Sequence, residues 1–142
     1  MEINITKLDI RNMVFTMGEE REATNQKLSD FLKENNVTAQ RNFIFDLVIK
    51  QGGKVNTLHL SYAAINEEVK GKDKVQALVL KNNDFLHFVV PKAEYESFLM
   101  GDDFKSITQY MKDNKLKNDF TSLYGLAEIM DDGYHFYIPF RK

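Results

Sequence analysis

FTMGEE, the stretch at residues 15–20, recurs as FLMGDD at residues 98–103. Phenylalanine, methionine, glycine and two acidic residues hold the same positions in both copies. A second echo follows each copy, as FLKEN at residues 31–35 and YMKDN at residues 110–114. The distance in sequence from the first motif to its echo is four residues longer in the first half than in the second, about one helical turn. The sequence therefore predicts an internal duplication, with each half built from the same order of elements.

The first copy lies between a strand and a helix. Apolar residues over 3–17 predict one strand, with a bulge where the pattern breaks at residues 9–12. Acidic residues after Gly18 then favour the first turn of a helix running from about 19 to 35. Its apolar positions follow the helical spacing i, i+4, i+7 and i+8, so one face is expected to be buried: Thr24, Leu28, Phe31 and Leu32.

Two further strands complete the first half. Alternating residues predict strands over 43–49 and 57–65, joined by the turn QGGK at residues 51–54. The polar stretch 66–74 is expected to be a connector. Residues 75–80 and 85–90 then flank KNND at 81–84, which indicates a hairpin outside the repeat.

The second half is expected to repeat this order. Residues 95–100 are predicted to continue a strand past Pro91, and Asp102 is predicted to cap the helix that follows. Strands over 123–130 and 134–140 would complete the half. The apolar face of this second helix is expected to carry Phe104, Ile107, Tyr110 and Met111.

Two strand-helix-strand-strand units related by a pseudo-two-fold axis predict an α+β fold. One antiparallel sheet would carry both helices on one face and leave a groove on the other. We expect a single domain over residues 1–142, with repeat one at about 1–66, a connector and extra hairpin at about 67–84, and repeat two at about 85–142.

Composition excludes several classes of protein. A chain of 142 residues can bury a core without disulfides, and the absence of cysteine removes thiol catalysis and cysteine-bound zinc. With 19 basic and 21 acidic residues and no basic stripe, no nucleic-acid partner is expected. There is no apolar segment of membrane-spanning length and no signal peptide, so we expect no membrane partner and a cytoplasmic location.

Three stretches are FVVPKAEYESFLMG at residues 88–101, AEIM at 127–130 and FYIPF at 136–140. The first is similar to the signature of the GyrI-like (gyrase-inhibitor-like) effector-binding domains, which occur alone or fused to transcription regulators. The other two resemble the last two strands of that family. The resemblance implies a small-molecule-binding fold of duplicated strand-helix-strand-strand units. Met130 stands where the family usually has tyrosine, and the chain has no tryptophan.

The resemblance also implies where a ligand would bind. In that family the groove lies between the repeats, is walled by aromatic rings and, in multidrug sensors, holds a glutamate that faces flat cations. By position this residue is Glu128, and a carboxylate among rings suits an organic cation. The expected ligand-binding residues are Glu128, Tyr95, Tyr124, Tyr134, His135 and Tyr137.

Plainer roles remain open for these residues. Glu128 could instead reach solvent at a strand end or pair with a lysine. Leu123, Ala127 and Ile129 make the opposite strand face apolar too, and if that face lines the groove, Glu128 is not a ligand residue.

The function expected from the sequence is a stand-alone small-molecule (effector) binding module for aromatic or cationic ligands. The alternative is a protein-interaction module, an inhibitor or accessory protein that acts through the sheet edge or the groove. A small-molecule hydrolase using Glu96 and Glu128 is a third reading, although the sequence favours a non-enzymatic role. His59, His87 and His135 show no local sign of convergence, so no metal and no cofactor are expected.

Overall fold

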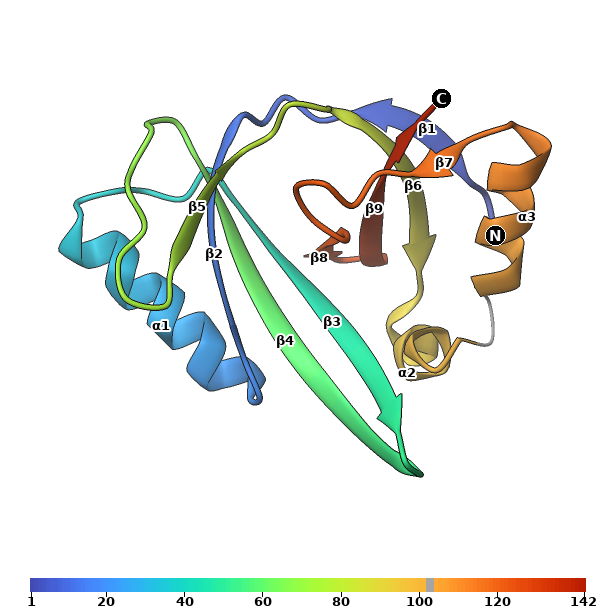
Figure 1. The fold of residues 1–142 in the computed structure, drawn as a ribbon, viewed down its shortest axis with the longest axis horizontal. Coiled ribbons are helices and arrows are strands. Elements are labelled where there is room, and N and C mark those ends of the chain that lie inside the picture. The colour runs from blue at the N-terminus through green and yellow to red at the C-terminus, as the bar shows by residue number, and fades with distance from the viewer. Residues whose placement is uncertain (102–103) are drawn as a thin grey trace. The chain divides into compact units, whose positions relative to one another are not determined.

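In a computed structural model the chain forms two compact units, each with its own antiparallel strands (Figure 1). The structure describes residues 1–101 and 104–142. The central unit comprises residues 10–81, and the terminal unit combines residues 1–9 with residues 82–142. None of the helices in the described parts of the chain is long and apolar enough to cross a membrane.

The central unit places one helix on four strands. The strands lie in the order β3, β4, β2, β5, and each neighbouring pair is antiparallel. The elements are β2 (Asn12–Gly18), α1 (Arg21–Glu34), β3 (Arg41–Gln51), β4 (Lys54–Ile65) and β5 (Gln76–Val79).

Helix α1 confirms the predicted amphipathic face. The four residues expected to be buried, Thr24, Leu28, Phe31 and Leu32, are the buried residues of the helix. The last three pack in one cluster with residues of β2 and β4 that include Val14, Ala63 and Ile65. Burial of large apolar side chains provides most of the favourable free energy of folding, so this helix face fixes α1 on the sheet.

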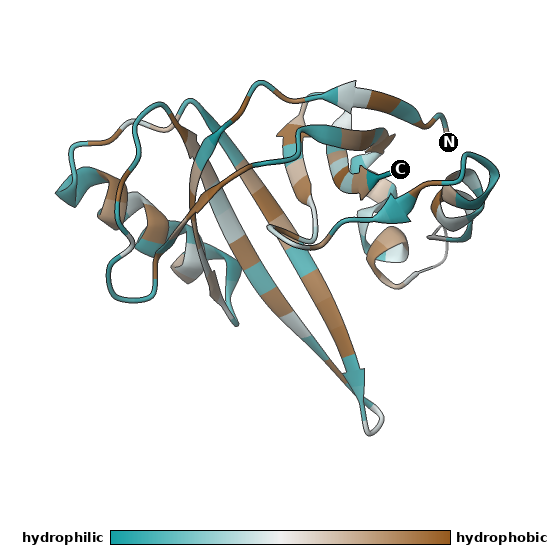
Figure 2. Ribbon diagram, turned by 45° about the horizontal axis from the view of Figure 1, so that its top comes forward, coloured by the Kyte–Doolittle hydropathy of each residue, from teal (hydrophilic) through white to brown (hydrophobic). Residues whose placement is uncertain are grey.

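The β3–β4 hairpin also follows the predicted pattern. The two strands pair from Arg41 opposite Ala64 to Gln51 opposite Lys54, and Gly52 and Gly53 form the turn. Figure 2 shows that both strands are hydrophobic over much of their length with hydrophilic breaks; in β3 the apolar runs 43–45 and 47–49 are separated by Asp46.

The terminal unit is built around β9. Its strands lie in the order β1, β6, β9, β8, and the short β7 also pairs with β9. The elements are β1 (Asn4–Lys7), β6 (Asp84–Val90), a 3-10 turn (Lys92–Glu94), α2 (Tyr95–Leu99), α3 (Phe104–Asp113), β7 (Lys117–Asn118), β8 (Leu126–Met130) and β9 (Gly133–Arg141).

Three phenylalanine rings form the centre of the terminal unit. Phe88 of β6 and Phe136 of β9 stack with ring centroids 5.3 Å apart, and Phe98 of α2 lies 4.8 Å from Phe136. Helix α3 confirms the predicted helix after residue 103, and its Ile107 and Met111 are buried as expected. We call the sheet face that carries Phe88 and Phe136 the helix face.

The single strand predicted over residues 3–17 is wrong, because the chain forms two strands there. β1 pairs with β6 in the terminal unit, whereas β2 pairs with β4 and β5 in the central unit. The break is not a bulge. The Leu8 amide donates to the Asn83 carbonyl, and the Leu80 amide donates to the Arg11 carbonyl, so the intervening backbone pairs with other segments.

The predicted hairpin around residues 81–84 is also wrong. β5 pairs with β2, and β6 pairs with β1 and β9, so the two strands that flank Lys81 do not pair with each other. Both strands are apolar and separated by a turn-like sequence, which is the local pattern of a hairpin. Their partners are supplied by segments far away in sequence.

The strand predicted over residues 95–100 is a helix, α2. Pro91 ends β6 with φ −55° and ψ 146°, and the chain then enters a 3-10 turn. FTMG at 15–18 closes a strand, while FLM at 98–100 lies in and just after a helix, so the two copies are not structural equivalents. The predicted cap at Asp102 lies outside the described residues.

The two units nevertheless share one strand order. Across each sheet, a strand (β2 or β6) lies beside the second arm of a hairpin (β3–β4 or β8–β9). A short edge strand (β5 or β1) lies on the other side of that strand. In the chain, α1 lies between β2 and β3, and α2 and α3 lie between the corresponding strands β6 and β8. This correspondence agrees with the predicted order of elements, while the duplication itself, the repeat boundaries and the groove stay predictions.

Candidate functional site

The six residues predicted to bind a ligand all lie in the terminal unit. Four of them are on the two faces of its sheet, while Tyr95 is on α2 and Tyr124 lies before β8. Successive residues of β9 point to opposite sides, so Tyr134 and Phe136 share one face while His135 and Tyr137 share the other. The face of Phe136 is the helix face. We call the opposite face, which carries His87, His135, Tyr137 and Glu128, the histidine face.

Tyr95 and Tyr134 form a pair on the helix face. Their rings stack with centroids 3.8 Å apart at an interplanar angle of 16°, and Tyr95 also lies 6.1 Å from Phe136. Tyr124 lies before β8, is 50% exposed and contacts Phe120 at 5.4 Å. These three tyrosines are therefore engaged with other rings, and two of them are on the side of α2.

Glu128 lies on β8 directly opposite His135 on β9. In the same register Leu126 is opposite Tyr137, so the half-buried Glu128 belongs to the histidine face. Directly opposite residues in an antiparallel pair have Cβ atoms about 4.5–5.5 Å apart. A carboxylate and an imidazole are thus neighbours on this face.

A row of three rings runs across the histidine face. His87 of β6 stacks on Tyr137 at 5.0 Å and on His135 at 5.1 Å, with interplanar angles of 22° and 23°. His87 Nε2 and His135 Nδ1 are 2.9 Å apart and share a hydrogen bond. His135 Nε2 lies 2.7 Å from Asp132 Oδ1 in the β8–β9 turn. The site joins two imidazoles and a phenol to two carboxylates.

The hydrogen bonds fix how protons are held. The Asp132 carboxylate accepts from His135 Nε2, so a neutral His135 accepts at Nδ1 the proton of His87 Nε2. Burial, and next the charge of His135, lower the pKa of His87 below 6.5, against an opposing effect of Asp132. The hydrogen bond from His135 is the main cause that lowers the pKa of Asp132 below 3.8. Near pH 7 the row therefore offers a neutral His87 beside negative charge.

The lowered pKa of His87 gives a prediction about stability. In the folded protein His87 resists protonation, while the unfolded chain takes up the proton near pH 6.5, so the unfolded state binds more protons below that pH. The free energy of unfolding should therefore fall as the pH is lowered from 7 to 5.5. Urea unfolding across this range should show a smaller fall for His87→Gln than for the wild type. Equal pH dependence in the two proteins would contradict the assignment.

The third histidine belongs to a different cluster in the central unit. His59 Nδ1 lies 2.5 Å from Asp46 Oδ1, and the same oxygen pairs with Arg21 of α1. Arg21 also donates to the Leu60 carbonyl at 2.7 Å, which holds the start of α1 on β4. Within residues 1–101 and 104–142 no group of three or more His, Cys, Asp or Glu residues has the arrangement to hold a metal ion.

His87 and Asp132 were missed as site residues by the sequence reading. His87 was weighed only as a possible zinc ligand, and Asp132 was not singled out. The dipeptide His-Phe recurs at residues 87–88 and 135–136, and in both copies the phenylalanine enters the core. Because neighbouring residues of a strand point to opposite faces, this repeat could have indicated two histidines on one face.

The fold is similar to two solved structures. The EcmrR C-terminal domain matches with a TM-score of 0.63 at 13% identity, covering 99% of this chain and 98% of that chain. An uncharacterized conserved protein from Listeria innocua matches with a TM-score of 0.59 at 11% identity, covering 99% and 91%. At these identities the likeness shows a shared fold. No protein-family model and no curated protein matches the sequence.

Proposed function

We propose that this protein is a small-molecule-binding module and that the histidine face of its terminal unit holds an aromatic cation. The proposed ligand-binding residues are Glu128, His135 and Tyr137 from the sequence prediction, together with His87. Tyr95 and Tyr134 would support this surface from the other side of the sheet, since Tyr134 is the neighbour of His135 on β9. Tyr124 is proposed as a peripheral contact.

The observation that carries the proposal is the stacked row of rings beside two carboxylates. The histidine face buries Phe85 and Leu126, and beside them it carries the polar side chains of His87, His135 and Glu128, with Asp132 in the adjoining turn. Ring faces and edges together with negative charge attract organic cations, which gain both stacking and electrostatic free energy. The neutral state of His87 near pH 7 avoids repelling such a ligand. Similarity to a C-terminal domain of another protein supports a modular role.

A matched pair of ligands tests the proposal. N-Methylphenanthridinium and phenanthridine have the same three-ring body, and only the first carries a permanent charge. We expect the cation to raise the melting temperature by several degrees at a hundred times its dissociation constant, where binding adds about 2.7 kcal/mol. Phenanthridine should have a smaller effect.

Glu128→Gln then tests the site. Replacing the carboxylate by an amide of the same shape removes the negative charge beside the cation. Cation binding should weaken by about fivefold or more, because the attraction between unit charges about 4 Å apart is about 1 kcal/mol in bulk water and larger near a protein surface. Glu96→Gln, an exposed carboxylate on α2, is the control and should bind as the wild type does. Calorimetric titration measures both. Equal affinity of Glu128→Gln and the wild type for the cation would refute the assignment of Glu128.

One observation favours a second candidate, a protein-interaction module. Phe120 and Tyr124 form a ring pair that is about half exposed, at 48% and 50%. Exposed aromatic side chains of this kind are typical anchors of protein interfaces. A partner that binds wild type but not Tyr124→Ala, with no effect of Glu128→Gln, would support this alternative over the ligand-binding module.

A further inference from the structure

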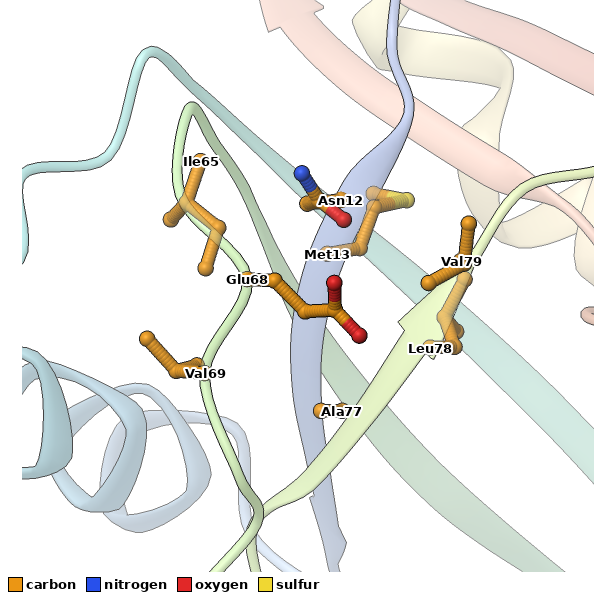
Figure 3. Close-up of a pocket in the computed structure, with 8 residues that line it drawn as sticks. All are labelled: Asn12, Met13, Ile65, Glu68, Val69, Ala77, Leu78 and Val79. Carbon is orange, nitrogen blue, oxygen red and sulfur yellow. The ribbon is translucent and has the colours of Figure 1, made fainter.

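A separate pocket lies wholly within the central unit. It has a volume of about 150 Å³ and is lined by residues of β2, β5 and the segment that follows β4 (Figure 3). Much of its wall is apolar, formed by side chains such as Met13, Ile65, Val69 and Leu78. None of the six residues expected to bind a ligand lines this pocket.

Two polar side chains contribute to the lining. Figure 3 shows Glu68 reaching from its segment toward β2, with its carboxylate directed into the pocket. Among residues 1–101 and 104–142, Glu68 makes no side-chain hydrogen bond and no ion pair. Asn12 donates from Nδ2 to the Asn66 carbonyl over a long 3.4 Å, which leaves its Oδ1 available as an acceptor.

The polar groups of the pocket are thus acceptors. A carboxylate and an amide oxygen can both receive hydrogen bonds, and the carboxylate also brings a negative charge. Glu68 is exposed, so water can solvate its carboxylate in the empty pocket. A neutral apolar molecule would gain no interaction with either oxygen, and an anion would be repelled by Glu68. An ammonium group supplies the charge and up to three donors.

The volume sets the size of the rest of the ligand. A cavity of about 150 Å³ in another protein accommodates benzene. The apolar wall would therefore accept one six-membered ring or a short branched chain. The three-ring cations considered for the histidine face are too large, since pockets for drug-sized ligands are about 300–1,000 Å³.

We propose that the pocket between β2, β5 and residues 65–69 binds a small organic ammonium ion, with the ammonium group on Glu68 and Asn12 and a compact apolar body against Met13 and Leu78. This site is independent of the histidine face. It would make the protein a receptor for simple primary amines in addition to its proposed aromatic ligand.

Cyclohexylammonium and cyclohexanol are suitable probes, because they share one ring and differ in charge. Titration of each into isotopically labelled full-length protein, followed by NMR, should give a dissociation constant at least about tenfold lower for cyclohexylammonium. Its resonance shifts should be centred on Met13, Ala77 and Leu78.

Three variants decide the assignment. Glu68→Gln should weaken cyclohexylammonium binding about tenfold or more and remove most of the preference over cyclohexanol. Ala77→Leu, at an exposed position of the lining, should fill the pocket and abolish binding of both probes. Glu128→Gln should change neither, which separates this site from the proposed function. Unchanged affinity in Glu68→Gln, or shifts centred on the histidine face, would overturn the proposal.

Discussion

Replacing Phe136 by alanine should lower the free energy of unfolding by about 3–5 kcal/mol. Phe136 is 1% exposed, and its ring contacts Phe88 at 5.3 Å and Phe98 at 4.8 Å. Alanine removes the ring and leaves a cavity between β6, β9 and α2. The loss combines the free energy of burying the ring with the contacts that the two remaining rings no longer make.

Urea unfolding of the variant measures this loss as a shift in the transition midpoint. Tyr124→Ala is the matched control, since it also removes a ring but at a half-exposed position. Its effect should be much smaller, within about 1 kcal/mol. Equal effects of the two substitutions would show that the three-ring cluster is not the centre of the terminal unit.

Gly133→Ala should be the second most damaging change, with a loss of about 3 kcal/mol or more. Gly133 begins β9 with φ +139°, a backbone conformation that residues with a side chain rarely adopt. A Cβ atom there would also lie 2.4 Å from the Val90 carbonyl oxygen and 3.1 Å from Pro91 Cα. Both contacts are backbone atoms, so the turn or the end of β6 must move.

Gly53→Ala separates these two causes. Gly53 also has positive φ, +78°, but a Cβ atom there has nothing within 4 Å. It should lose only the conformational part, about 1 kcal/mol. Because His135 follows Gly133 by two residues, Gly133→Ala should also disturb the histidine face, and Gly53→Ala should not. Comparable stability of the two variants would contradict the close approach at Gly133.

The correctly predicted elements are those whose signal is local. Helix α1 follows from the spacing of Leu28, Phe31 and Leu32, and the β3–β4 turn follows from two adjacent glycines. Both patterns are complete within a short stretch of chain. The α+β class with antiparallel strands was also predicted, because it depends only on telling most helices from most strands.

The errors arise where distant segments decide the structure. The apolar pattern over residues 3–17 breaks at residues 9–12, and a bulge and a strand end look alike there in the sequence; β1 and β2 pair in different units. The apolar stretch at 95–100 has residues suitable for a strand, but after Pro91 it forms α2, and Phe98 packs on Phe136. Tertiary packing overrides local preference in such short apolar segments.

Part of the candidate site was predicted from the sequence, and part of it depends on the pairing of distant strands. Glu128, His135 and Tyr137 were identified from the sequence, and the register of β8 with β9 places them on one face. His87 joins them through the pairing of β6 with β9, which no local pattern reveals. Tyr134 is separated from these residues by the alternation of side chains along β9, whereas the separation of Tyr95 depends on α2 being a helix on the other face.

The imidazole resonances of the three histidines give the most direct test of the histidine face. In a titration with N-methylphenanthridinium followed by proton NMR, the signals of His87 and His135 should shift together and saturate, while the signal of His59 should stay constant. His87→Gln, His135→Gln and His59→Gln assign the three signals. Binding that moves the His59 signal, or that leaves those of His87 and His135 unchanged, would contradict a ligand site on this face.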